Sequence, residues 1–189
     1  LQHPTRGLLQ PGEFLPLAEE TRLIGDISEW VLATACREMG SWLDQTGDDV
    51  RLSVNFSPMQ VEHPRFVDLL LQKLDHYGLP PQRLEIEITE NMIISDLEQI
   101  SQKLDQLSSY GIKVAIDDFG TGYSSLNDLP PLPIHTLKVD QSFVRGIRQG
   151  KEGACIVNAI TAMARGLQLD IVAEGVETHD QLTYLRELG

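Results

Sequence analysis

The chain has 189 residues, of which 41% are hydrophobic and 23% are charged, and its formal net charge at pH 7 is −13. This composition is typical of a soluble globular domain with a sizeable core, and no apolar run reaches the ~18–20 residues of a membrane-spanning helix. The acidic balance argues against a general binder of DNA or RNA. The chain has two cysteines far apart in sequence, Cys36 and Cys155, which argues against a disulfide framework and against a zinc site. We therefore expect a reduced, cytoplasmic protein.

Helical patterns cover Pro11–Glu20 and Asp26–Leu43, and after them short apolar runs alternate with further helical patterns. The runs typical of strands are Arg51–Asn55, Leu84–Thr89, Lys113–Asp117, Thr136–Asp140 and Asp170–Glu174. The later helical patterns are Pro64–Tyr77, Asp96–Tyr110, Ala154–Leu167 and His179–Leu188. Gly78 and Gly111 follow two of these helices, where a left-handed residue commonly ends a helix. The alternation predicts parallel strands joined by helical crossovers.

The two faces of each predicted strand differ, which favours one α/β architecture over another. In the second strand, Ile86 and Ile88 fall on one face and Glu85 and Glu87 on the other. An open parallel sheet is covered by helices on both sides, whereas a barrel has helices only on its outside. The pattern therefore predicts an α/β fold, a (β/α)₈ TIM-like barrel. Because five strands stand where eight are needed, we expect the barrel to be incomplete in this chain, with the missing strands beyond its two ends or, for one, within the first 50 residues.

Each predicted strand ends, on its polar face, in a residue suited to metal or phosphate chemistry. These residues are Asn55, Glu87, Asp117 with Asp118, Lys138 and Glu174. Buried carboxylates carry a desolvation cost that hard cations such as Mg²⁺ or Mn²⁺ relieve, and two metals can clamp an attacking water and a phosphodiester. Lys138 is placed to orient the water, to pair with a carboxylate or to bind a phosphate oxygen. A single acid at a strand end is more often a helix N-cap or a solvated loop residue, and Asp118, Thr178 and Ser95 are all candidates for caps. The pattern alone therefore leaves both interpretations open.

A glycine-rich segment, Gly120–Ser125, follows the two aspartates. It lacks the third glycine of a dinucleotide-binding fingerprint and is not a phosphate-binding P-loop. By itself it indicates only a loop whose backbone amides are available to an anion.

Seven motifs in the chain closely resemble, in order and spacing, those of the EAL domain family, bacterial phosphodiesterases that hydrolyse cyclic di-GMP to the linear dinucleotide pGpG. They are HPTRG (His3–Gly7), PGEFLPLAEET (Pro11–Thr21), VNFSP (Val54–Pro58), EIEITE (Glu85–Glu90), DDFGTGYSSL (Asp117–Leu126), LKVDQSFV (Leu137–Val144) and AEGVET (Ala173–Thr178). The motifs cover nearly the whole chain, and DDFGTGYSSL followed by AEGVET is very specific. The resemblance implies a single EAL phosphodiesterase domain over residues 1–189 and an EAL-type barrel.

The resemblance also implies individual roles. The metal ligands, for Mg²⁺ or Mn²⁺ and two ions per site, are Asn55, Glu87, Asp117, Asp118 and Glu174. Lys138 positions the attacking water, Asp118 helps to activate it, and Glu90 braces the loop after the aspartates. That loop, which links metal binding to dimerisation, consists of Phe119, Gly120, Thr121, Gly122, Tyr123, Ser124 and Ser125. The residues that contact the substrate are Arg6, Pro11, Phe14 and Leu17, and Glu177 is a carboxylate close to the metals.

Two catalytic positions of the family would fall outside the chain: the glutamate of the namesake Glu-Ala-Leu, before Leu1, and a glutamine beyond Gly189. Every family catalytic position inside the chain is present. We therefore expect a domain truncated at both ends, active in a longer parent protein. Taken alone, the chain is expected to be poorly closed and inactive, because a missing barrel strand exposes sheet edges.

Two other functions remain as alternatives. The first is a receptor that binds cyclic di-GMP without cleaving it; such relatives usually carry substitutions among the ligands or in the loop, and none appears here. The second is a scaffold that acts through protein contacts alone, which the intact site disfavours. As partners, the resemblance implies a second copy in a homodimer and, in the parent protein, attached GGDEF or sensor domains or a membrane tether.

Overall fold

Five parallel strands form the central sheet of the computed structural model, which describes residues 1–95, 97–121, 132–147 and 151–189. The strands lie side by side in chain order: β3 (Leu52–Asn55), β4 (Leu84–Thr89), β5 (Lys113–Phe119), β6 (Thr136–Val139) and β7 (Asp170–Ala173). Each neighbouring pair is parallel. All five predicted strands are present, with ends within two residues of the predicted ones.

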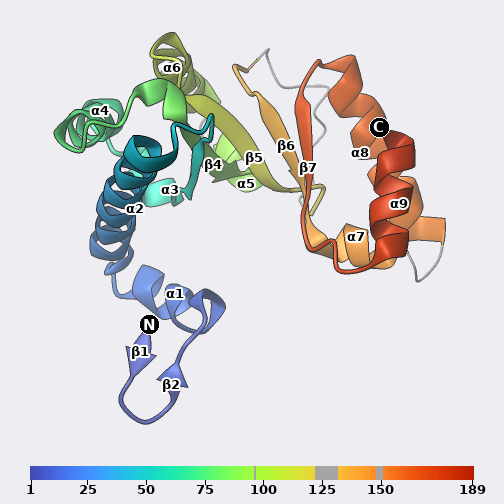
Figure 1. Cartoon of the computed structure of the whole chain (residues 1–189), viewed down its shortest axis with the longest axis horizontal. Coiled ribbons are helices and arrows are strands. Elements are labelled where there is room, and N and C mark those ends of the chain that lie inside the picture. The colour runs from blue at the N-terminus through green and yellow to red at the C-terminus, as the bar shows by residue number, and fades with distance from the viewer. Residues whose placement is uncertain (96, 122–131, 148–150) are drawn as a thin grey trace.

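Helices connect the successive strands. Between β3 and β4 lie α3 (Pro58–Glu62), α4 (Phe66–His76) and the 3₁₀ turn η1 (Pro81–Arg83). Between β4 and β5 lie α5 (Glu90–Ser95) and α6 (Leu97–Ser109), and Asp96, where the predicted helix begins, is outside the described residues. Between β6 and β7 lie α7 (Gln141–Gly146) and α8 (Lys151–Gly166), and α9 (His179–Leu188) follows β7. In Figure 1, α4 and α6 flank the sheet at one end and α8 and α9 at the other. The fold is α/β with the crossovers of a (β/α) barrel, and in the described part of the chain its five strands form an open row.

The N-terminal segment departs from the sequence-based prediction of a barrel strand in the first 50 residues. Its two short strands, β1 (Gln2–His3) and β2 (Gly7–Leu8), pair antiparallel with each other and not with the central sheet. The turn between them is held by His3, whose Nδ1 accepts hydrogen bonds from the backbone amides of Thr5 and Arg6, both at 3.2 Å. Two helices follow, α1 (Pro11–Glu20) and α2 (Ile24–Thr46), and Figure 1 shows that α2 connects the hairpin to the sheet.

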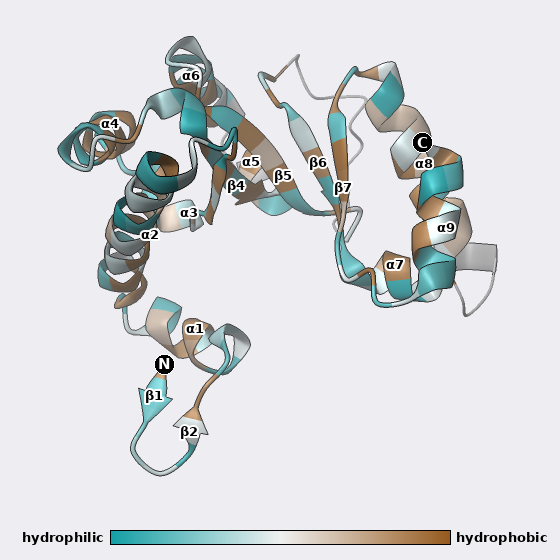
Figure 2. Cartoon of the chain, in the orientation of Figure 1, coloured by the Kyte–Doolittle hydropathy of each residue, from teal (hydrophilic) through white to brown (hydrophobic). Residues whose placement is uncertain are grey.

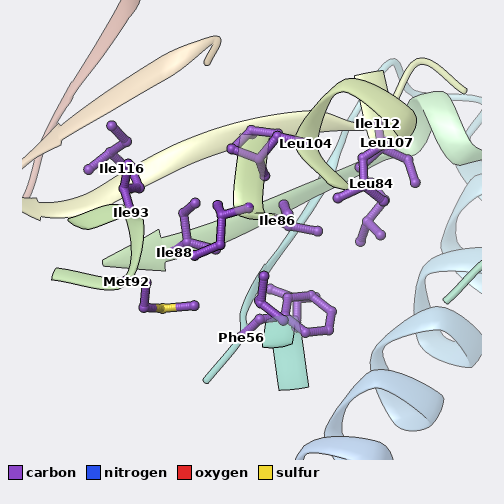
Figure 3. Close-up of a cluster of buried hydrophobic side chains, with 14 of the residues drawn as sticks. Phe56, Leu84, Ile86, Ile88, Met92, Ile93, Leu104, Leu107, Ile112 and Ile116 are labelled. Carbon is purple, nitrogen blue, oxygen red and sulfur yellow. The ribbon is translucent and has the colours of Figure 1, made fainter. Parts of the chain in front are cut away.

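The apolar faces of the central strands form the core together with the helices that cover them. Ile86, Ile88 and Ile116 are at most 1% exposed, and Leu104 and Leu107 of α6 pack against them with no exposed surface. Figure 3 shows these side chains in one cluster with Met92 and Ile93 of α5. Each such side chain stabilises the fold by about 1.5–3 kcal/mol through burial. In Figure 2 the helices carry both hydrophobic and hydrophilic residues, as expected when only one face is buried.

Two helix ends agree with the sequence pattern. Gly78 has φ of 66° and Gly111 has φ of 80°, both in the left-handed region that glycine adopts without strain. The Thr178 side chain caps α9 by accepting a hydrogen bond from the Gln181 amide at 3.3 Å. The capping interpretation is therefore confirmed for Thr178.

Helices α7 and α8 meet at a glycine pair. A Cβ atom added at Gly153 would lie 2.5 Å from the carbonyl carbon of Gly146. We expect Gly153→Ala to lower the free energy of unfolding by about 1–3 kcal/mol, because backbone rather than a flexible side chain must move. The matched control is Gly166→Ala in the same helix, where nothing lies within 4 Å of an added Cβ. Urea unfolding of both variants measures the difference, and equal stabilities would contradict the close approach.

Candidate active site

Lys138 lies at the centre of a charged cluster on the polar face of the sheet. Its Nζ is 2.8 Å from Glu87 Oε2, 3.2 Å from Asp117 Oδ1 and 2.6 Å from Glu174 Oε1. Lys138 belongs to β6, Glu87 to β4 and Asp117 to β5, while Glu174 directly follows β7. The side chains of Lys138 and Glu87 are only 12% and 8% exposed. One lysine therefore joins carboxylates from three other strands where the parallel strands end.

Asn55 brings the remaining strand, β3, into the same cluster. The register of β3 and β4 places Asn55 opposite Glu87, and its Nδ2 donates a hydrogen bond to Glu87 Oε2 at 2.8 Å. The same carboxylate oxygen thus accepts from both Asn55 and Lys138. Five of the six residues singled out at the strand ends form one connected network.

The sixth, Asp118, reaches the cluster through an irregularity in β5. Side chains alternate along a strand, so Asp117 and Asp118 should point to opposite faces. Asp118 instead has φ of 53°, and the pairing of β5 with β6 shifts register between Ile116 and Phe119. As a result, one oxygen each from Asp117, Asp118 and Glu174 lie within 4.8 Å of one another. A local irregularity of this kind re-aims a side chain next to a functional site.

The cluster holds more negative than positive charge. Lys138 pairs with three carboxylates, and the fourth, Asp118, lies beside Asp117 and Glu174. Burial alone would lower the pKa of Lys138, but hydrogen bonds to Glu174 and Glu87 and the charges around it raise that pKa well above its ordinary value. The lysine therefore remains protonated at neutral pH.

Asp118 and Asp140 have pKa values shifted in opposite directions. Burial raises the pKa of Asp118, and the charges of Asp117, Asp140 and Glu174 raise it further. Burial also acts to raise the pKa of Asp140, but hydrogen bonds from Ser142, from the backbone and from Asp118 outweigh it, and the pKa of Asp140 is lowered. Asp118 is therefore the group that donates the hydrogen bond between the two carboxyls when one of them is protonated.

The donor set fits a hard divalent cation. The three convergent groups are carboxylates, and the amide oxygen of Asn55 and the carboxylate of Glu87 lie in the adjoining network. Mg²⁺ and Mn²⁺ prefer oxygen ligands of this kind. A bound cation would also offset the excess negative charge that a single lysine leaves. The arrangement therefore suits metal binding, with the identity of the metal open.

The start of the predicted loop contacts Glu90. Glu90 is 4% exposed, and its Oε2 accepts a hydrogen bond from the Gly120 amide at 3.2 Å. Gly120 has φ of 93°, and a Cβ there would lie 3.1 Å from a ring carbon of Phe143. Thr121 Oγ1 donates to the Asp118 carbonyl at 2.8 Å. Phe119 ends β5 and is 4% exposed. The rest of the predicted loop lies outside the described residues, namely Gly122, Tyr123, Ser124 and Ser125.

The structure does not bring the other predicted site residues into contact with the cluster. Glu177 is 64% exposed and lies 3.4 Å from the guanidinium of Arg145. Arg6 pairs with Glu13 at 2.7 Å, within the N-terminal segment. The remaining three predicted residues lie on α1 and are Pro11, Phe14 and Leu17. The Leu17 side chain is 62% exposed. Among the contacts given for the described residues, none joins these five to the Lys138 cluster.

Sequence reasoning gave no role to two residues that contact the site. Ser53 Oγ is 2.5 Å from Glu87 Oε1, and Asp140 bonds to Asp118 and caps α7 through the Ser142 amide at 2.9 Å. Both occupy the polar face of their predicted strands, which is the signal that could have identified them. A serine or an aspartate at such a position is too common to stand out without the contact itself.

The whole chain, residues 1–189, matches the EAL domain family. It belongs to that family. MucR of Pseudomonas aeruginosa, named a bifunctional diguanylate cyclase and cyclic di-GMP phosphodiesterase, is 46% identical over 188 residues, covering 100% of this chain and 27% of MucR. The signaling protein YkoW of Bacillus subtilis is 42% identical over 186 residues, covering 98% of this chain and 23% of YkoW. The EAL chain thus spans about a quarter of the length of the curated relatives it matches.

Solved structures of other EAL domains have the same fold. The MucR phosphodiesterase in complex with c-di-GMP superposes with a TM-score of 0.95 at 46% identity, covering 100% of this EAL chain and 76% of that chain. The Pseudomonas aeruginosa FimX EAL domain bound to c-di-GMP gives a TM-score of 0.86 at 26% identity, covering 100% and 75%. Among the helices that the structure describes, none is both long and apolar enough to cross a membrane.

Proposed function

We propose that this chain is a single EAL phosphodiesterase domain, over residues 1–189, that hydrolyses cyclic di-GMP to linear pGpG in a metal-dependent reaction. The observation that carries the proposal is the Lys138 cluster, in which a protonated lysine pairs with three carboxylates and two of these, Asp117 and Glu174, converge with Asp118. The MucR and FimX structures, both described as complexes with c-di-GMP, support the substrate class.

The proposed metal ligands are Asn55, Glu87, Asp117, Asp118 and Glu174. Mg²⁺ or Mn²⁺ held there, as two ions, would lower the pKa of a water molecule and neutralise charge on the phosphodiester. The protein's own contribution is the arrangement of the ligands. Hydrogen bonds from Asn55 and Lys138 to the Glu87 carboxylate hold two of these ligands, Asn55 and Glu87, in fixed positions before any metal or substrate arrives.

Asp118 and Lys138 have different roles in the proposed reaction. Hydrolysis joins the oxygen of water to phosphorus and breaks the bond from phosphorus to a ribose 3′ oxygen, so the water loses one proton and the leaving oxygen gains one. Asp118, whose pKa is raised, is the proposed acceptor of the water's proton, and the proton then passes from Asp118, directly or through solvent, to the leaving 3′ oxygen. Lys138 stays protonated, so its Nζ acts as a hydrogen-bond donor that orients the water or a phosphate oxygen and does not act as a base.

The remaining roles belong to the same proposal. Glu90 holds the loop after the aspartates through the Gly120 amide. The groups proposed to contact the guanine and phosphate of the substrate are Arg6, Pro11, Phe14 and Leu17. Since Arg6 is paired with Glu13, substrate binding would exchange that exposed ion pair for a phosphate contact. Glu177 is proposed to act near the metals, which requires it to leave Arg145.

For the whole protein we propose a cytoplasmic, homodimeric enzyme whose EAL domain is joined to GGDEF or sensor domains. The attachment of further domains is supported by MucR, whose name combines cyclase and phosphodiesterase activities and which is about four times as long as the matched segment.

The experiment that tests the function is hydrolysis of cyclic di-GMP by the chain and by the longer protein that contains it. The nucleotides are separated by chromatography after incubation with Mg²⁺, Mn²⁺ or EDTA. We expect pGpG to appear only with metal, and Asp117→Asn to lower turnover at least ~100-fold, because it removes a charged ligand. Tight binding of cyclic di-GMP without any linear product would instead identify a receptor, and neither binding nor product would refute both functions.

A further inference from the structure

Ser53 of β3 lies on the polar face of the sheet, two residues before Asn55. Its Oγ is 2.5 Å from Glu87 Oε1 and 3.5 Å from Glu85 Oε2. An ionised carboxylate only accepts hydrogen bonds, so the serine hydroxyl is the donor. The longer contact is at the limit of a hydrogen bond, which makes Glu87 the principal acceptor.

The partners of Glu87 are divided between its two oxygens. Oε2 accepts from Asn55 Nδ2 and from Lys138 Nζ, each at 2.8 Å. Oε1 accepts from Ser53. The serine therefore donates to the carboxylate oxygen that Asn55 and Lys138 do not contact. A donor on each oxygen opposes rotation of a carboxylate about its last side-chain bond.

A second hydroxyl holds the neighbouring carboxylate in a different place. Glu85 and Glu87 lie on the same face of β4, two residues apart, and both carry negative charge. Thr136 Oγ1 donates to Glu85 Oε1 at 2.7 Å. Ser53 is therefore the near hydroxyl donor of Glu87, and Thr136 is the near hydroxyl donor of Glu85.

We propose that Ser53 is a positioning residue for the metal centre, which acts by fixing the orientation of the Glu87 carboxylate. This inference rests on the proposed function, because it requires Glu87 to be a metal ligand. Without the hydroxyl, Oε1 loses its donor and the carboxylate is free to rotate away from Asn55 and Lys138. Partners that orient a ligating group in this way typically change metal affinity by 10–100-fold.

The test measures, by titration calorimetry, the affinity for Mn²⁺ alone of the longer protein that contains this chain, in four variants and in the unmodified protein. Ser53→Ala is expected to weaken Mn²⁺ binding by about 10–100-fold. Ser53→Thr keeps the hydroxyl, and the exposed setting of residue 53 leaves room for the extra methyl group, so it is expected to restore most of the affinity. Thr136→Val is the matched control, because it removes a hydroxyl from the same face that bonds to Glu85 and not to Glu87.

Glu87→Gln separates failure of this inference from failure of the proposed function. If Ser53→Ala binds Mn²⁺ as tightly as the unmodified protein while Glu87→Gln does not, only the inference about Ser53 is wrong. If Glu87→Gln also binds normally, or the unmodified longer protein binds no Mn²⁺, the proposed metal site fails and the inference fails with it. An equal loss in Thr136→Val and Ser53→Ala would show a general disturbance of the sheet and would also overturn the inference.

A double-mutant cycle in metal-free buffer tests the hydrogen bond itself. Urea unfolding of Ser53→Ala, Glu87→Ala and the double variant is expected to show a coupling of about tenfold in the unfolding equilibrium constant, as for a hydrogen bond to a charged group. Alanine replaces Glu87 in this cycle because a glutamine would keep an oxygen that accepts from Ser53. Additive effects of the two substitutions would contradict the contact on which the inference depends.

Discussion

Replacing Lys138 by methionine is expected to give the largest loss of any single substitution in the site. Lys138→Met removes the cation that Glu87, Asp117 and Glu174 share, and leaves largely buried negative charges without a partner. Removing one partner from a buried ion pair typically costs about 3–5 kcal/mol, so we expect the free energy of unfolding in metal-free buffer to fall by that order. Turnover is expected to fall by about 10²–10⁴-fold with the loss of the positioned donor. Urea unfolding and the pGpG assay measure the two effects.

Lys138→Arg is the control for charge. It keeps a cation near the carboxylates but replaces a compact ammonium by a planar fork, so we expect most of the stability to remain while turnover is lost. Added Mn²⁺ should recover part of the stability of Lys138→Met, since ligand binding to the folded state raises its stability and a divalent ion restores positive charge. A Lys138→Met variant that unfolds at the same urea concentration as the unmodified chain would show that the three ion pairs do not contribute.

Asp118→Asn is expected to separate stability from activity. The pKa of Asp118 is raised in the folded state, so the ionised carboxylate opposes folding. That penalty is absent below the unfolded pKa of 3.8 and grows as the pH rises through the folded pKa. An asparagine removes the charge and also suits φ of 53° better than most residues. We therefore expect the metal-free protein to gain about 1–2 °C at pH 7, a small effect because Asp118 is exposed to solvent.

The same substitution should lower turnover by at least ~100-fold, because it removes the proposed proton acceptor and a metal ligand. Thermal melts of Asp118→Asn from pH 3 to pH 8 check the sign, since the gain should shrink toward acid pH. The exposed Asp48→Asn is the control for removing a carboxylate outside the site. A gain that grows toward acid pH, or unchanged turnover, would contradict the assignment of Asp118.

The central sheet was predictable because its strands carry strong signals. Ile86 and Ile88 alternate with Glu85 and Glu87, and this period of two appears in each strand. The helices α3, α5 and α7 were not predicted, because they have only five or six residues, less than two turns, and show no helical period. The β1–β2 hairpin was missed for a similar reason, since each strand has two residues.

The position of the charged cluster followed from topology alone. Parallel strands end at the same edge of a sheet, so residues 55, 87, 117, 138 and 174 had to meet if the strands were correct. The convergence of Asp117 and Asp118 could not be derived in that way, because it depends on the left-handed backbone at Asp118 and the register shift in β5. The pairing of Ser53 with one particular oxygen of Glu87 depends on side-chain rotation, which the sequence does not encode visibly.

The cluster draws its members from both ends of the row of strands, with Asn55 on β3 and Glu174 directly after β7. These outer strands have more exposed residues than β4 and β5 between them. Local opening of a protein usually begins where few apolar contacts hold the backbone, so the outer strands should open before the central ones. Such an opening would separate Asn55 or Glu174 from the Lys138 cluster while the inner strands stay folded. Metal and substrate that bridge the two outer strands would then suppress these local openings, so occupancy of the site would be reported by slower amide exchange in β3 and β7.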